Sequence, residues 1–156
     1  AAIGNPIPAL ELLWLAVPAA LVLVLSVYSI RVLLLIEAPR SDPLLVEIAA
    51  SQYRWEFHYP ESGVTTNELH LPAGRPAVLQ FRSSDVIHSF WVPVFGGKID
   101  ALPDRVTSLA LTPLRTGEHQ AVCAELCGVG HAGMIASVWV EDPAGFEQWL
   151  QSGGGD

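Results

Sequence analysis

The chain has 156 residues, of which 51% are hydrophobic, and a formal net charge of −8. This length is enough for one ordinary domain and one additional segment, and the hydrophobic share exceeds that of a typical soluble domain. The acidic balance argues against nucleic acid as a partner, because phosphates would repel it, and it favours partners with a basic surface.

The first predicted element is a transmembrane helix over residues 12–36. This run is apolar apart from one formal charge, Arg31. Its 25 residues are enough to cross a hydrocarbon core of about 30 Å, whereas the apolar region of a signal peptide covers only about 7–15 residues. We therefore predict an N-terminal segment over 1–11, a single helix in membrane lipid, and a proline-containing linker over 37–43.

Residues 44–142 show the alternation of apolar and polar side chains that is typical of β-strands. In the stretch 53–59, aromatic side chains alternate with polar ones at a period of two. Glycine and proline breaks separate this stretch from further strand candidates at 44–50, 68–71, 77–81, 85–94, 106–112, 119–123 and 134–140. This spacing predicts a mainly β domain, built as a β-sandwich or barrel. Residues 143–156 are predicted to form a short helix over 144–151 and a frayed tail.

Four side chains with metal-binding chemistry lie within the twelve residues 123–134: Cys123, Cys127, His131 and Met134. His88 stands 35 residues before Cys123, on another predicted strand that can meet the same pole of a sandwich. Thiolate, imidazole and thioether together favour copper over magnesium or calcium, and a structural zinc site rarely includes methionine. A disulfide between the two cysteines is the alternative, but it would leave the nearby histidine and methionine unexplained.

The second cysteine extends the prediction from one copper to two. A mononuclear blue-copper site uses one cysteine, two histidines and a weak axial ligand. Two thiolates four residues apart can instead bridge a pair of copper ions, each with one histidine and one weaker ligand. Sharing one electron over two metals reduces the geometric change on oxidation and reduction. The residues therefore predict an electron carrier with a dinuclear copper centre.

Three blocks of the sequence resemble subunit II of the haem–copper cytochrome c oxidases. They are residues 52–59, the block that begins at Asp85 and runs through His88 to Pro103, and residues 123–134. The resemblance implies a cupredoxin-like Greek-key β-sandwich or barrel over 44–142, preceded by one transmembrane helix. In that family two such helices usually precede the domain, and the predicted helix is similar to the second of them.

The resemblance also implies a role for each candidate ligand of the copper A centre. Cys123 and Cys127 match the bridging thiolates, and Met134 matches the weak thioether ligand. The terminal imidazoles match His88 and His131.

Glu125 has two implied roles. Its backbone carbonyl matches the group that completes the copper shell, and its carboxylate matches one that binds magnesium or manganese at the interface with subunit I.

Electron transfer from the donor is expected to pass through the aromatic block. The tryptophan that usually receives the electron in this family falls on Tyr53, and Trp55 is retained two residues later, so both are candidates. Trp55 can equally be a core residue on the buried face of its strand. Asp85 is expected either to contact the donor or to brace the copper loop.

Taken together, the resemblance implies the copper A subunit of a proton-pumping terminal oxidase in the cell (inner) membrane. It would accept electrons from cytochrome c or a similar carrier on the periplasmic, outer face. The electrons would pass to haem in subunit I, which is the subunit that reduces oxygen, within a complex that contains other oxidase subunits. Two alternatives are the same module serving a nitric oxide reductase and a membrane-tethered copper-handling protein.

Overall fold

The computed structural model describes residues 8–36 and 41–154, and the chain divides into two units, residues 1–39 and 40–156. The first unit contains helix α1 (Pro8–Ile36), which begins four residues before the predicted transmembrane segment. Among the described residues, this is the one helix that is long and apolar enough to cross a membrane by length and composition. Most of the linker predicted over 37–43, and residues 1–7 of the N-terminal segment, lie outside the described residues.

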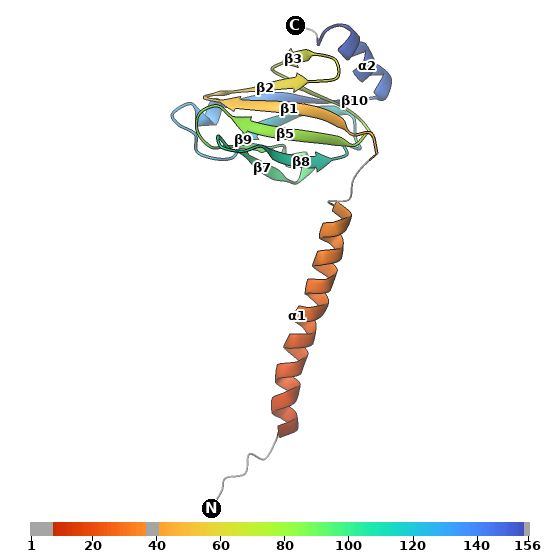
Figure 1. The fold of residues 1–156 in the computed structure, drawn as a ribbon, viewed down its shortest axis with the longest axis vertical. Coiled ribbons are helices and arrows are strands. Elements are labelled where there is room, and N and C mark those ends of the chain that lie inside the picture. Colours follow the sequence, from red (N-terminus) through yellow and green to blue (C-terminus); the bar gives the residue numbers. More distant parts are fainter. Residues whose placement is uncertain (1–7, 37–40, 155–156) are drawn as a thin grey trace, which may run out of the picture. The chain divides into compact units, whose positions relative to one another are not determined.

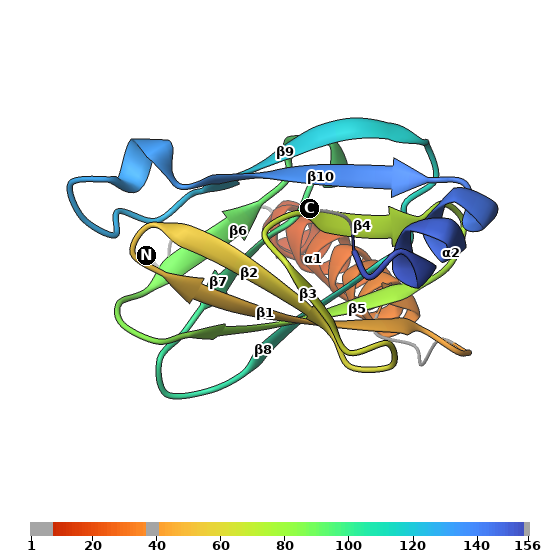
Figure 2. The same ribbon diagram turned by 90° about the horizontal axis from the view of Figure 1, so that it is seen from above.

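The second unit consists of two five-stranded sheets that face each other (Figures 1 and 2). In spatial order, the first sheet contains β3 (Val64–Thr66), β2 (Arg54–Tyr59), β1 (Leu44–Ser51), β5 (Ala77–Ser83) and β8 (Thr107–Leu111). The second sheet contains β4 (Leu69–Pro72), β10 (Ile135–Glu141), β9 (Gly117–Cys123), β6 (His88–Trp91) and β7 (Lys98–Ala101). The predicted mainly β sandwich is therefore confirmed.

Alternation along the strands places the hydrophobic core between the two sheets. In β2, the side chains of Trp55, Phe57 and Tyr59 are at most 1% exposed, whereas Arg54 and Glu56 face solvent. The parallel pairing of β1 with β5 and of β4 with β10 brings segments that are distant in sequence side by side. Residues from both sheets thereby bury each other, which is the main source of stability for a sandwich of this size.

Two strands were not predicted, and one is shorter than expected. The strand predicted over 85–94 is reduced to β6, because the chain bends at residues 84–86 and a 3₁₀-helix, η1 (Pro93–Phe95), follows the strand. The two additional strands, β3 and β7, have only three and four residues, and both follow a glycine-containing turn. In three or four residues, the alternation of apolar and polar side chains cannot be told from a loop sequence. These strands are recognised only by their pairing with β2 and β6.

Helix α2 (Pro143–Gln151) follows the last strand and packs against β4 and β10. Asp142 caps its first turn by accepting a hydrogen bond from the Gly145 N–H at 2.9 Å. In the tail that follows this helix, the Trp149 indole N–H donates to the Gly154 carbonyl at 3.0 Å. Residues 155–156 lie outside the described part. Helix α2 and the loop that joins β9 to β10 lie at opposite ends of the sandwich (Figure 2).

Candidate metal centre

The loop between β9 and β10 carries most of the candidate metal donors. Cys123 is the last residue of β9, and a short 3₁₀-helix, η2 (His131–Gly133), immediately precedes Met134. The Cys123 N–H donates to the Met134 carbonyl at 3.0 Å, which closes the base of the loop. Gly128 allows the turn after Cys127 because its φ of +133° is a conformation that other residues rarely adopt.

The two thiols lie at the middle of the site, with one imidazole beside each of them. The Sγ atoms of Cys123 and Cys127 are 3.8 Å apart. Nδ1 of His88 lies 3.9 Å from the Cys123 Sγ, and Nδ1 of His131 lies 3.6 Å from the Cys127 Sγ. The structure therefore brings together two sulfurs and two ring nitrogens from β6, β9 and the loop.

Two weaker donors complete this group. Sδ of Met134 lies 3.8 Å from the Cys127 Sγ, and the carbonyl oxygen of Glu125 lies 3.2 Å from the Cys123 Sγ. Glu125 itself is exposed to solvent. Each thiol thus has one imidazole and one weaker donor beside it.

The donors are largely removed from water. His88 and Met134 are fully buried, and Cys123 and Cys127 are 7% and 4% exposed. Burial, together with the neighbouring Cys123, raises the pKa of the Cys127 thiol to about 11. The metal-free thiol is therefore protonated at neutral pH, and a metal that binds there displaces a proton.

A carboxylate fixes the orientation of the His88 ring. Asp85 Oδ1 lies 2.7 Å from Nε2 of His88, and the same carboxylate accepts hydrogen bonds from the backbone N–H groups of Gln52 and Val86. Burial alone would raise the pKa of Asp85, but these hydrogen bonds outweigh it and lower the pKa to about 2. Because the ionised carboxylate accepts the proton of Nε2, the lone pair of Nδ1 is directed at the sulfurs, as expected for a metal ligand.

The chemistry of these donors fits a soft transition metal. Donor atoms of His88, Cys123 and Cys127 all lie within 4.8 Å of one another, close enough to share a metal ion. Thiolates, imidazoles and a thioether are the donor types that copper prefers, and both histidines present the same ring nitrogen. The residues present therefore fit copper.

The two candidates for receiving electrons occupy different environments. Tyr53 is partly buried, and its ring lies so close to the loop that a Cβ added to Gly130 would be 2.4 Å from the ring atom Cδ2. Trp55 is 1% exposed, and its ring centroid lies 6.1 Å from that of His88 in an edge-on arrangement. Tyr53 is therefore a partly exposed residue that packs against the loop, whereas Trp55 is a core residue beside His88.

The exposed surface around the loop is mostly apolar. Leu126 is 78% exposed and Val129 is completely exposed at the tip of the loop, while Ile87 beside β6 is 46% exposed. A molecule that approaches the buried donors from this side would first meet hydrocarbon side chains.

Sequence reasoning did not identify the contact that Gln52 makes with the loop. Its side-chain amide donates to the carbonyl oxygen of Cys127 at 2.5 Å, across a separation of 75 residues. The folded turn between β1 and β2 brings this residue to the site. The sequence spacing of the metal donors does not indicate that Gln52 lies near them.

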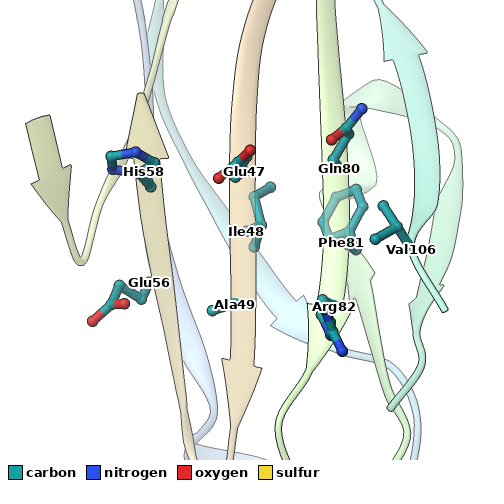
Figure 3. A pocket seen from close by; sticks show the side chains of 9 residues that line it. All are labelled: Glu47, Ile48, Ala49, Glu56, His58, Gln80, Phe81, Arg82 and Val106. Atoms are coloured by element: carbon teal, nitrogen blue, oxygen red, sulfur yellow. The ribbon is translucent and has the colours of Figure 1, made fainter. Parts of the chain in front are cut away.

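A surface hollow of about 360 Å³ lies apart from this centre, on the outer side of β1, β2 and β5 (Figure 3). Polar and charged side chains stand around it, and none of its lining residues is a candidate metal donor: Glu47, Ile48, Ala49, Glu56, His58, Gln80, Phe81, Arg82 and Val106. The donor group is therefore a set of atoms in mutual contact that is suited to holding an ion, and it is separate from this hollow.

A β-sandwich that gathers two thiols, two imidazoles and a thioether at one end has the architecture of a cupredoxin-like domain. A family model of the periplasmic domain of cytochrome c oxidase subunit II matches residues 63–140. The chain belongs to the cytochrome c oxidase subunit II family, which implies copper at this site.

Individual relatives agree with this assignment. The chain is 44% identical over 110 residues to cytochrome c oxidase subunit 2 of Thermostichus vulcanus, covering 70% of this chain and 33% of that protein. It is 43% identical over 142 residues to the alternative cytochrome c oxidase subunit 2 of Bradyrhizobium diazoefficiens, covering 71% of this chain and 51% of that protein. The chain thus spans only a third to a half of these two relatives.

A solved structure shares the fold. The crystal structure of the periplasmic domain of cytochrome oxidase subunit II from Bradyrhizobium japonicum superposes with a TM-score of 0.69 at 29% identity, covering 74% of this chain and 95% of that one. An apolar N-terminal helix followed by a domain of this periplasmic family is the organisation of a membrane-anchored protein.

Proposed function

We propose that this chain holds a dinuclear copper A centre and serves as the electron-accepting subunit of a proton-pumping terminal oxidase. Electrons would come one at a time from cytochrome c or a similar carrier and would pass to haem in subunit I, where oxygen is reduced. Bound copper would supply one-electron redox chemistry. The chain's own residues would hold it, exclude water from it and connect it to the two electron-transfer partners.

The observation that carries this proposal is the pair of thiols. A mononuclear site needs one cysteine, whereas Cys123 and Cys127 lie 3.8 Å apart and each has its own imidazole beside it. The thiolates of Cys123 and Cys127 would hold the copper together with the imidazoles of His88 and His131. Met134 and the Glu125 carbonyl would be the weaker ligands.

The exposed side of the loop supports separate roles for two further residues. Tyr53 is partly exposed and packs against the loop at Gly130, so we propose that it receives electrons from the donor in preference to the buried Trp55. The exposed carboxylate of Glu125 is available to bind magnesium or manganese together with groups of subunit I. Asp85 is better placed to brace His88 than to contact the donor, because its carboxylate already accepts four hydrogen bonds, one each from Gln52, Ser83, Val86 and His88.

We place the protein in the cell (inner) membrane, with the sandwich on the periplasmic, outer face. The apolar helix would lie in lipid, and the sandwich would contact subunit I and the other oxidase subunits. This arrangement is supported by the match to a periplasmic-domain family and by the length of the helix, 28 residues between Ala9 and Ile36.

The test of the copper assignment is the electron paramagnetic resonance spectrum of the copper-loaded chain. The oxidised protein is expected to show one unpaired electron coupled to two equivalent copper nuclei. Replacing a bridging thiol, in Cys123→Ser, is expected to abolish this pattern because a hydroxyl cannot take the place of the thiolate between two coppers.

The matched control is Ala124→Ser, which adds a hydroxyl at the next position without removing a donor, and it is expected to keep the two-copper pattern. A two-copper pattern that persists in Cys123→Ser would contradict the ligand assignment. A wild-type chain that binds copper without this spectrum and readily releases it would instead indicate a copper-handling protein.

A further inference from the structure

Gln52, in the turn between β1 and β2, contacts two separate parts of the metal centre. The backbone N–H of Gln52 donates to Asp85 Oδ2 at 2.7 Å. Its side-chain amide donates to the carbonyl oxygen of Cys127 at 2.5 Å. Gln52 is exposed overall, yet both of its donor groups are used inside the protein.

The first contact leads to one of the imidazoles. Asp85 uses its other oxygen, Oδ1, to hold Nε2 of His88 at 2.7 Å, and the Ser83 hydroxyl donates to that same oxygen at 3.2 Å. The Gln52 backbone therefore holds one oxygen of the carboxylate, the Ser83 hydroxyl and the Val86 N–H hold the other, and the carboxylate in turn orients the ring of His88.

The second contact leads to one of the sulfurs. Cys127 is close to three other donor groups, since its Sγ lies 3.6 to 3.8 Å from atoms of Cys123, His131 and Met134. The amide of Gln52 lies directly against the backbone at this point, because a Cβ on Gly128 would be 2.9 Å from Nε2 of Gln52. A hydrogen bond to the Cys127 carbonyl fixes the peptide from which this thiol projects.

We propose that Gln52 is a positioning residue for the metal centre, holding the Asp85–His88 pair with its backbone and the Cys127 segment with its side chain. One residue outside the donor set thereby fixes the separation between donors that come from different strands. This inference rests on the proposed function in taking copper as the metal, and it adds a residue that binds neither metal nor electron-transfer partner.

The test compares three variants of the full 156-residue chain, loaded with copper in detergent at pH 8. Gln52→Ala removes the side-chain contact, and Gln52→Glu keeps the length of the side chain but removes the donor. The matched control is Gln120→Ala, an exposed glutamine on β9 three residues before Cys123. The measurements are the copper hyperfine pattern of the oxidised protein and the rate at which the reduced protein loses copper to a Cu(I) chelator.

Both Gln52 variants are expected to lose copper roughly five- to tenfold faster than wild type, which corresponds to the loss of one hydrogen bond. Their hyperfine splitting is expected to change, because the Cys127 sulfur moves relative to His88. Gln120→Ala is expected to match wild type in both measurements.

Two results would overturn the proposal. If Gln52→Glu matches wild type and only Gln52→Ala changes, the side chain acts by packing and its donor is irrelevant. If both variants match Gln120→Ala, the Gln52 side chain does not position the Cys127 segment, and the proposal that Gln52 holds both parts of the centre is wrong. Failure of the proposed function looks different, because wild type and Gln120→Ala would then also lack coupling to two copper nuclei.

Discussion

At the scale of single residues, the Tyr53 ring limits which side chains fit in the metal loop, the segment between β9 and β10 that carries most of the donors. The Tyr53 ring lies where side chains at positions 128 and 130 would project, so both positions need glycine as long as the ring is there. The φ of Gly130 is −89°, a value that any residue can adopt, so its requirement is one of space alone. Gly128 has the additional requirement of a positive φ.

Gly130→Ala is therefore expected to destabilise the protein by about 1–3 kcal/mol, the usual cost of overpacking a well-packed contact. The added Cβ would lie 2.4 to 2.7 Å from three atoms of the Tyr53 ring, so the ring or the loop must move. Chemical denaturation of the metal-free chain measures the free energy of unfolding.

The same measurement in two further variants identifies the cause. Gly133→Ala is the matched control, because a Cβ there meets nothing within 4 Å, and it is expected to cost less than about 0.5 kcal/mol. In a Tyr53→Ala background the cost of Gly130→Ala is expected to become small, because the obstructing ring is absent. An unchanged cost in that background would mean that the clash lies elsewhere.

The residue scale also shows what the sequence could and could not predict about the site. Cys123, Cys127, His131 and Met134 are grouped in the chain, so their soft-donor chemistry is visible as spacing. The bond from Gln52 to Cys127 depends on how the β1–β2 turn folds over a loop 75 residues away, and no local pattern encodes it.

At the scale of secondary-structure elements, helix α2 anchors one end of the sandwich. Phe146 is 1% exposed, and the Trp149 ring lies flat on His70 with the ring centroids 3.9 Å apart. His70 is in turn held by Glu141, whose Oε2 lies 3.1 Å from its Nδ1. A histidine outside the metal motif thus has a packing role at the end remote from the donors.

Phe146→Ala is expected to lower the free energy of unfolding by about 3–5 kcal/mol, the usual cost of truncating a buried phenylalanine. Because α2 lies at the opposite end from the metal loop, the copper spectrum of the folded fraction is expected to stay unchanged. Denaturation curves and the spectrum of the same samples measure the two effects.

Gln148→Ala, on the exposed side of the same helix, serves as the matched control and is expected to change stability by no more than about 0.5 kcal/mol. A Phe146→Ala variant with a normal denaturation curve would show that α2 contributes little to the fold. An altered copper spectrum would show that the two ends are coupled.

Elements with long alternation were predictable, and short ones were not. Strand β2 was visible because Trp55, Phe57 and Tyr59 alternate with polar residues over its whole length. β7 has four residues, of which only Ala101 is buried, so its identity depends on pairing with β6. The order of strands in the sheets likewise depends on contacts between distant segments, such as the parallel pair β1 and β5.

At the scale of the whole molecule, the β-sandwich domain is acidic, whereas the surface next to the metal loop is apolar. Residues 44–156 carry thirteen acidic and six basic side chains, a net charge of about −7 with histidine neutral. The rim of the metal loop, by contrast, includes the exposed apolar side chains of Leu126 and Val129. The net charge should therefore set the association rate of an electron-donor protein, and apolar contacts at the loop should set its orientation in the complex.

The rate of electron transfer from a basic cytochrome c is accordingly expected to fall, by about tenfold, as ionic strength rises from about 10 mM to 150 mM. Salt shortens the distance over which the acidic surface attracts the donor. Stopped-flow measurement of the second-order rate constant tests this. An uncharged reductant is the control and should show a constant rate, whereas a cytochrome c rate that stays flat or rises with salt would contradict electrostatic attraction.

The closed base of the metal loop links metal affinity to the stability of the sandwich. The bond between the Cys123 N–H and the Met134 carbonyl comes directly after the ladder in which Val122 pairs with Ile135. Strand pairing therefore brings both ends of the loop together before any ion arrives, and the entropy lost in ordering the loop is part of folding rather than of binding. A substitution that weakens the pairing of β9 with β10 would leave the loop disordered before the ion binds. The ordering cost would then be part of binding, so metal affinity would fall although every donor is still present.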